Sequence, residues 1–368
     1  MNNFKIFIFL WFVLSLVACS SNPTQAPAPI AATPVTSPET PAPEATEAPT
    51  QPASSSMPDI AQYGLIGRLV MIQWHPNGNR LVELDLGSGD IHTLFQAPEK
   101  SWLFEAVVSP DGQQILLSYA PPLPGDETQF GYSDLYLMPG DGSSQPQPFL
   151  TRSDPQEAYF FTTWASDSQS VFYTHLYLID PEAEVRAYQN DVEWASLSGE
   201  TKTIVEHALW PAVSPDGSKL AYLSADPVTF SNDLYLANPD GSEQAPVLQP
   251  GVNPPVDAHL FTLDGEQLIF SMVNLQPAPA SSWLERLFGI EVASAHNVPS
   301  DWYLISIYGG TPQRLTTLDE LNLNGDLSPD GSQLAFIGSS GLYVMNTDGS
   351  NLLQLSNEVL VGSVNWLP

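Results

Sequence analysis

The histidines and acidic side chains of this chain are the residues that could act as metal ligands or as acid–base catalysts. The six histidines lie at positions 75, 92, 175, 207, 259 and 296, and no two share the spacing that places metal ligands on one helix face. Scattered histidines of this kind are more often ordinary loop or core residues. We therefore predict neither a metal nor a cofactor, and we keep a metal-assisted lyase or hydrolase as the alternative.

Other catalytic and cofactor motifs are also missing from the sequence. No Gly-x-Ser-x-Gly pentapeptide occurs, so a serine peptidase is not expected, and no Walker or dinucleotide-binding glycine pattern occurs. The segment Asn346–Asn351 has some features of a calcium loop but is not followed by the glutamate that such loops carry at their last position. A tight turn is the simpler explanation of this Asp-Gly-Ser segment.

The charge balance limits the possible partners. The chain has 368 residues with 10 basic and 41 acidic side chains, which gives a formal net charge of −31. Phosphate backbones and anionic lipid headgroups both require Lys and Arg, so nucleic acid is excluded as a partner. Apolar residues make up 43% of the chain, which is enough for a substantial core.

The N-terminus has the pattern of an export signal. Lys5 precedes an apolar run over residues 6–18, which is too short to span a membrane with confidence and has the length of a signal-peptide core. The run ends in Leu-Val-Ala-Cys at Cys19, which resembles the lipobox of bacterial lipoproteins. The resemblance implies a signal peptide over 1–18 and an acylated Cys19 that anchors the chain in the cell envelope, at the outer face of the plasma membrane or at an outer membrane. The alternative is an ordinary secretory peptide in which Cys19, the only cysteine, is incidental.

Residues 19–58 form the predicted anchor and tether. From Ser20 to Pro58 the chain contains ten prolines and no aromatic residue, so it cannot bury enough apolar surface to offset its ordering entropy. We expect a solvated spacer that holds the following domain away from the membrane. A docking site for a proline-binding module is the alternative.

A repeated turn motif organises residues 59–368. Ser-Pro-Asp-Gly begins at Ser109, Ser214 and Ser328, and weaker copies begin at Ala165 and Thr262. Each copy precedes a strand-like apolar run. Proline sets the first turn dihedral, aspartate caps the turn and glycine accepts a positive φ, so each copy predicts a tight β-hairpin.

Each unit also contains a second hairpin, in which Leu-Tyr is followed by Asp-Gly-Ser or a similar turn, as in Asp134–Ser143 and Asp233–Ser242. Four antiparallel strands in a repeated unit of about 50 residues are typical of a β-propeller blade. With Ser-Pro-Asp-Gly, Leu-Tyr-Leu/Val and Asp-Gly-Ser, the chain from Leu65 onward resembles the TolB-type, WD-repeat-like propeller family. The resemblance implies the fold and leaves the function open, because one fold serves many functions.

The number of strands predicts how the ring closes. Three strand-like segments (68–72, 80–84 and 91–94) precede the first motif, and the C-terminal segment 359–366 is a lone strand. We expect that strand to complete the N-terminal blade, so that no sheet edge stays open. The predicted fold is therefore all-β, a six-bladed β-propeller of four-stranded antiparallel blades over residues 59–368.

The two faces of such a ring differ in the length of their loops. Short turns join the first to the second and the third to the fourth strand of each blade, on what we call the short-turn face. The second-to-third and inter-blade connections lie on the loop-rich face, and they include the long segments 120–133, 175–191, 225–232 and 274–300. Long loops on a rigid scaffold usually carry binding, so we place the candidate site on the loop-rich face. Its candidate residues are Glu105, His175, Trp210, His259, Trp283 and Phe288.

The longest insertion has the pattern of a short amphipathic helix. A capping-type serine precedes Trp283, and the apolar residues Trp283, Leu284, Leu287 and Phe288 follow at helical spacing. We expect this helix to pack on its own propeller, and a partner-contacting helix is the alternative.

The predicted function is that of a lipid-anchored binding or scaffold module rather than an enzyme. The expected partner is a cell-envelope protein or an extracellular ligand, and the chain is expected to act as a monomer. The alternative is a carbohydrate-binding protein or a metal-assisted enzyme that uses the channel mouth of the ring.

Overall fold

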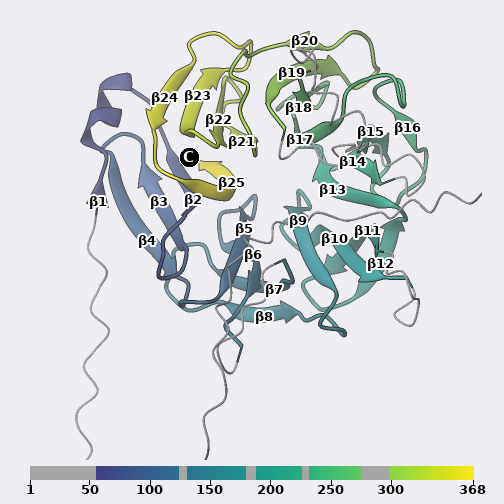
Figure 1. The fold of residues 1–368 in the computed structure, drawn as a ribbon, viewed down its shortest axis with the longest axis horizontal. Coiled ribbons are helices and arrows are strands. Elements are labelled where there is room, and N and C mark those ends of the chain that lie inside the picture. The colour runs from purple at the N-terminus through teal and green to yellow at the C-terminus, as the bar shows by residue number, and fades with distance from the viewer. Residues whose placement is uncertain (1–54, 124–130, 180–187, 226–231, 275–297) are drawn as a thin grey trace, which may run out of the picture. The chain divides into compact units, whose positions relative to one another are not determined.

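The strands form six antiparallel sheets arranged in a ring, which we number blades 1 to 6 in chain order (Figure 1). This computed structural model describes residues 55–123, 131–179, 188–225, 232–274 and 298–368. The predicted fold class is confirmed: the described residues form an all-β, six-bladed propeller.

The blades contain the following strands, from the innermost to the outermost. Blade 1 has β25 (Leu360–Leu367), β2 (Arg68–Gln73), β3 (Arg80–Asp85), β4 (Asp90–Gln96) and the short β1 (Ser55–Ser56). Blade 2 has β5 (Trp102–Val108), β6 (Gln114–Ala120), β7 (Asp134–Pro139) and β8 (Gln147–Leu150). Blade 3 has β9 (Ala158–Trp164), β10 (Ser170–Leu178), β11 (Tyr188–Ser196) and β12 (Thr201–Val205).

The other three blades follow the same order. Blade 4 has β13 (Ala208–Val213), β14 (Leu220–Ala225), β15 (Asn232–Ala237) and β16 (Ala245–Pro246). Blade 5 has β17 (Val256–Phe261), β18 (Gln267–Val273), β19 (Ser300–Ser306) and β20 (Gln313–Arg314). Blade 6 has β21 (Asn324–Leu327), β22 (Gln333–Gly338), β23 (Gly341–Asn346) and β24 (Leu353–Ser356).

The ring closes as predicted, through the C-terminal strand. β25 pairs antiparallel with β2, from Arg68 opposite Leu367 to Gln73 opposite Leu360. It also contacts blade 2, where Asn365 accepts a hydrogen bond from the backbone of Val108 at 3.0 Å. Closure therefore joins the two ends of the propeller in one sheet and fixes that sheet to its neighbour.

The hairpin turns have the hydrogen bonds that the repeated motif requires. The Ser109 hydroxyl donates to the Asp111 carboxylate at 2.7 Å, and the Gly112 amide donates to the Ser109 carbonyl at 2.8 Å with φ of +70°. Equivalent bonds from Ser214 and Ser328 hold the pKa of Asp216 and Asp330 at about 2. These carboxylates stabilise the folded state when ionised, and that stabilisation is lost as the pH falls from about 3.8 to about 2.

A second repeated aspartate is buried in the first half of the third strand of four blades. Asp134, Asp191, Asp233 and Asp301 each accept a backbone N–H from the segment that follows the fourth strand, at 2.6 to 3.1 Å. Each of them thus ties the third strand of its blade to the connection that leads to the next blade. Many of the acidic residues that give the chain its negative charge therefore stabilise its turns and blades.

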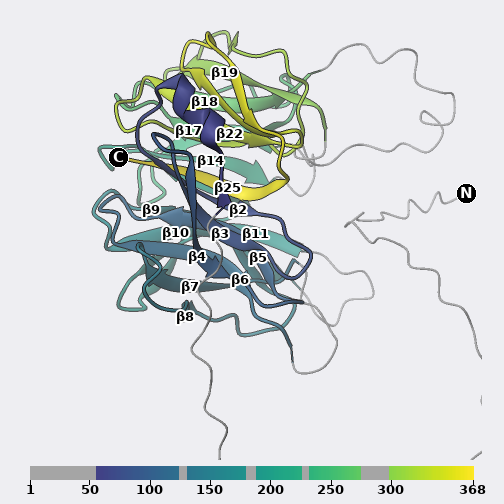
Figure 2. The ribbon, with the colours of Figure 1, turned by 90° about the vertical axis from the view of Figure 1, so that its left-hand side faces the viewer.

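The chain segment before the ring packs against its outer side. The 3₁₀ helix η1 (Pro58–Tyr63) lies on the outside of the ring (Figure 2) and buries Ile60 in an apolar cluster with Leu84 of blade 1 and Leu342 of blade 6. Strand β1 pairs with β4, so Ser55 and Ser56, within the segment predicted to be tether, are part of the sheet of blade 1.

One predicted loop is wrong in its bounds. Residues 175–191 were expected to form a long connection, but β10 continues to Leu178 and β11 begins at Tyr188, and the two strands pair over their whole length. The two paired strands of blade 3 therefore extend further than the corresponding strands of the other blades. His175 therefore lies in a strand and not in a loop.

Candidate functional site

The innermost strands surround the axis of the ring (Figure 1) and carry three of the six candidate residues, Glu105, Trp210 and His259. In five of these six strands the pairing register shifts near the strand centre, which indicates a β-bulge. At the bulges, Phe161, Trp210 and Gly362 have positive φ values of 46°, 55° and 73°. A bulge redirects side chains, and a positive φ is costly for an aromatic residue, so the surrounding contacts must hold these rings in place.

A chain of aromatic contacts links these strands from blade 2 to blade 5. Phe161 stacks on Trp210 with ring centroids 4.0 Å apart and planes 7° apart, and Trp210 lies 6.4 Å from the His259 ring. On the other side, Phe104 contacts Phe161 at 5.8 Å. The aromatic arc, as we call it, consists of Trp102, Phe104, Phe160, Phe161, Trp210 and His259.

The aromatic arc lies toward the loop-rich face. Its members occupy the first or central residues of β5, β9, β13 and β17, and each of these strands starts at an inter-blade connection of that face. Trp210 and His259 are buried, whereas Trp102, Phe104, Phe160 and Phe161 are half-buried. The structure thus brings the predicted residues Trp210 and His259 together, and it adds four aromatic residues that sequence reasoning missed.

Glu105, also predicted, lies beside this arc but points between two blades. Its Oε2 accepts hydrogen bonds from the backbone amide of Thr162 at 2.8 Å and from the Thr162 and Ser118 hydroxyls at 3.1 and 3.3 Å. Burial raises its pKa to about 7. Glu105 therefore joins blade 2 to blade 3 as a largely protonated acid below neutral pH.

This burial predicts a pH dependence of stability. The unfolded chain releases the Glu105 proton near pH 4.5 and the folded chain near pH 7, so the free energy of unfolding should fall as the pH rises between these values. The Glu105→Gln variant retains an acceptor for Thr162 without ionising, so it should lose this part of the pH slope. Urea unfolding at pH 5 and at pH 7.5 measures the effect, with Glu266→Gln at an exposed position as the control. An unchanged slope in Glu105→Gln would contradict the assignment.

His259 has one free ring nitrogen. Its Nδ1 donates to the Asp257 carbonyl at 3.2 Å, and its Nε2 is buried without a hydrogen-bond partner among the described residues. Burial lowers the pKa of His259, so the imidazole is neutral, with its free lone pair on Nε2.

His175 belongs to a different cluster, on the two middle strands of blade 3. Its Nδ1 lies 3.0 Å from Glu193 Oε1 and its Nε2 lies 3.8 Å from Glu157 Oε2. The Tyr173 hydroxyl donates to Glu193 at 2.7 Å. Burial alone would raise the pKa of Glu193, but the hydrogen bonds from His175 and Tyr173 lower it.

Two predicted residues, Trp283 and Phe288, lie outside the described residues, as does the helix predicted around them. Within the described ranges, no three His, Cys, Asp or Glu side chains are grouped so that they could hold a metal ion. No helix in the described part of the chain is long and apolar enough to cross a membrane.

The described strands and their closure define a six-bladed β-propeller. The sequence matches no family model, and no curated protein is recognisably similar to it. Several solved structures share the fold. TolB from Acinetobacter baumannii matches with a TM-score of 0.56 at 15% identity, over 82% of this chain and 67% of that one.

Two other structures match equally well at still lower identity. One belongs to a nidogen/laminin complex, with a TM-score of 0.56 at 9% identity over 82% of this chain and 98% of that chain. The other is hydrazine synthase from Kuenenia stuttgartiensis, with a TM-score of 0.56 at 12% identity over 82% and 47% of the two chains. Because these names span binding proteins and an enzyme at such low identity, the comparison establishes the fold alone.

Proposed function

We propose that this protein is an extracytoplasmic, lipid-anchored propeller that binds a cell-envelope protein or an extracellular ligand through its loop-rich face. The aromatic arc is the observation that carries the proposal. Its four half-buried rings come from two adjacent blades, and Phe104 and Phe161 lie at bulges with Trp102 and Phe160 close by. Bulges often re-aim side chains next to functional sites. Aromatic side chains are also enriched at binding interfaces.

Exposed apolar residues on the same face support this proposal. Trp74 and Val359, which are 55% and 59% exposed, lie next to each other because the Trp74 amide donates to the Val359 carbonyl at 3.0 Å. Ile179 and Val252, 55% and 64% exposed, also lie in connections of the loop-rich face. Exposed apolar side chains on the face that carries the half-buried aromatic rings suit a protein partner better than a charged one.

The polar groups near the axis support binding rather than catalysis. Glu105 is hydrogen-bonded to Thr162 of the next blade. The Asp326 carboxylate accepts the backbone amides of Leu327 and Trp366, and Asn365 bonds to blade 2. These groups hold neighbouring blades together, so they are not available to a substrate.

Crosslinking from the two faces tests the binding proposal. A photoreactive residue at Trp74, on the loop-rich face, should give discrete adducts with one envelope component in intact cells, while the same residue at Tyr308, on the short-turn face, should not. Adducts from Tyr308 alone, or none from either position, would overturn the choice of face.

The anchor is tested separately. Cys19→Ala should move the protein from the detergent phase to the aqueous phase in a phase-separation assay and abolish labelling with a fatty-acid analogue. Equal partitioning of the variant and the parent would mean that Cys19 is not the anchor.

The alternative, a metal-assisted enzyme near the axis, would use the free Nε2 of His259. A rise in Tm with Mn²⁺ or Zn²⁺ that His259→Gln removes would favour this alternative over the binding scaffold.

A further inference from the structure

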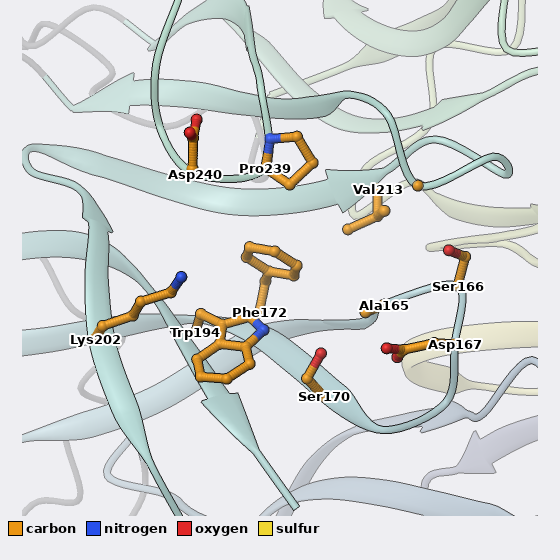
Figure 3. A pocket seen from close by; sticks show the side chains of 11 residues that line it. Ala165, Ser166, Asp167, Ser170, Phe172, Trp194, Lys202, Val213, Pro239 and Asp240 are labelled. Carbon is orange, nitrogen blue, oxygen red and sulfur yellow. The ribbon is translucent and has the colours of Figure 1, made fainter.

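A groove opens on the short-turn face between blades 3 and 4, on the opposite side of the ring from the proposed binding face. Its main cavity has a volume of about 400 Å³, and a second cavity of about 240 Å³ shares Ser166 and Val213 with it. Trp194 and Phe172 lie in the middle of the main cavity, between Lys202 at one end and Ser166 and Asp167 at the other (Figure 3). The size is that of a small-molecule site.

The end of the groove at Asp167 is formed by the hairpin turn that departs most from the repeat. In the four other first turns a hydroxyl donates to the aspartate two residues later, at 2.6 or 2.7 Å. Blade 3 has Ala165 at the hydroxyl position, so Asp167 accepts only the Gln169 amide among the described residues, at 2.8 Å. This is the one first turn of the five whose exposed carboxylate has no hydroxyl partner within the described chain.

The same turn has a serine where the repeat has proline. Ser166 is exposed, and its hydroxyl lies so close to Gly217 of blade 4 that a Cβ on that glycine would come within 2.5 Å of it. Together, the two changes place the Ser166 hydroxyl and the Asp167 carboxylate side by side at the wall of the groove, with Asp167 lacking a hydroxyl partner within the described chain.

The middle and the far end of the groove add an aromatic surface and a charged pair. Phe172 and Trp194 are cross-strand partners, with Phe172 buried and Trp194 half-buried. The Lys202 ammonium lies 4.8 Å from the centre of the Trp194 ring. Asp240, on the blade 4 side, completes this end.

We propose that this groove binds a neutral oligosaccharide. Each sugar hydroxyl both donates and accepts, so one ring can donate to Asp167 or Asp240 and accept from Lys202 or Ser166. The apolar face of a sugar ring packs on an aromatic plane, and on Trp194 it would displace the Lys202 ammonium from over the ring. Two carboxylates in the groove and a net charge of −31 disfavour acidic polymers.

A peptide fits the groove less well. Extended peptides bind chiefly by adding a strand to an open sheet edge, whereas this groove is lined by turns and by strand faces. The ligand class proposed for this site does not depend on the partner of the loop-rich face.

Calorimetric titration of the full chain, in a detergent without a sugar headgroup, tests the proposal. The probes are malto-, cello-, xylo- and chitohexaose. At least one should bind saturably, and Asp167→Ala should weaken its affinity at least tenfold. Ala165→Ser restores the missing hydroxyl partner of Asp167, so it should weaken binding about fivefold without removing any atom.

Matched controls separate this groove from other turns and from the other face. Ser328→Ala removes the equivalent hydroxyl donor of Asp330 in blade 6, where Ser332 still donates, and it should leave the affinity unchanged, as should Trp74→Ala on the loop-rich face. The proposal is overturned if no hexasaccharide binds, if Asp167→Ala binds as tightly as the parent, or if model tetrapeptides bind in the groove and the sugars do not.

Discussion

Replacing Gly362 by alanine should destabilise the propeller by about 4 kcal/mol, because it adds steric overlap to an unfavourable backbone conformation. Gly362 lies at the bulge of the closing strand β25 with φ of +73°, and a Cβ there would come within 1.9 Å of the Phe104 carbonyl oxygen. That oxygen belongs to the backbone of β5, so the clash can be relieved only by moving blade 1 away from blade 2. Urea unfolding followed by tryptophan fluorescence measures the loss.

Gly112→Ala is the matched control for this prediction. Gly112 has nearly the same φ, +70°, but a Cβ there would meet nothing within 4 Å. Its cost should be only that of the backbone conformation, about 1 kcal/mol. Equal losses in the two variants would show that the contact between blades 1 and 2 does not limit position 362.

Asp301→Ala should be nearly as damaging, with a loss of about 3 kcal/mol, because removing one partner of a buried pair leaves unpaired polar groups behind. Asp301 is fully buried and accepts hydrogen bonds from the Thr316 hydroxyl at 2.7 Å and the Leu318 amide at 2.6 Å. It also pairs with the Arg314 guanidinium. Asp301→Asn retains an acceptor and should lose less stability.

Asp348→Ala is the comparison for Asp301. Asp348 lies in an exposed turn, where its carboxylate accepts the Ser350 amide at 2.8 Å, so its removal should cause a far smaller loss. If the two alanine variants unfold at the same urea concentration, the buried aspartates of the third strands do not stabilise the blades as proposed.

The fold could be predicted because its signals are local. Each Ser-Pro-Asp-Gly turn forms its hydrogen bonds within six residues, as between Ser109 and Gln114, so the sequence motif and the structure correspond directly. Closure by the C-terminal strand followed from counting strands. The extension of β10 and β11 could not be predicted, because the pairs that extend it, Tyr177 with Gln189 and Leu178 with Tyr188, lie where the other blades have already turned into loops.

The candidate site was harder to predict because its contacts join different blades. Trp210 and His259 were both among the predicted residues and lie close together, but Phe161 stacks on Trp210 only because both strands bulge at the same level of the ring. No pattern in the sequence indicates a positive φ at an aromatic residue. The sequence does contain a signal for the groove, because Ala165 and Ser166 stand where the repeat has serine and proline. That these two residues line a cavity could be seen only in the structure.

The way the chain enters the ring has a mechanical consequence. Strand β1 is held by two residue pairs at the outer edge of blade 1, Ser55 with Ile91 and Ser56 with Asp90. After η1, the chain continues into β2, which is bonded on both sides, to β25 and β3. A force applied at Ser55 would first peel off this short ladder and then unwind η1, and both yield at low tension. Pulling on the N-terminus would therefore lengthen the chain before it strained the sheet that closes the ring.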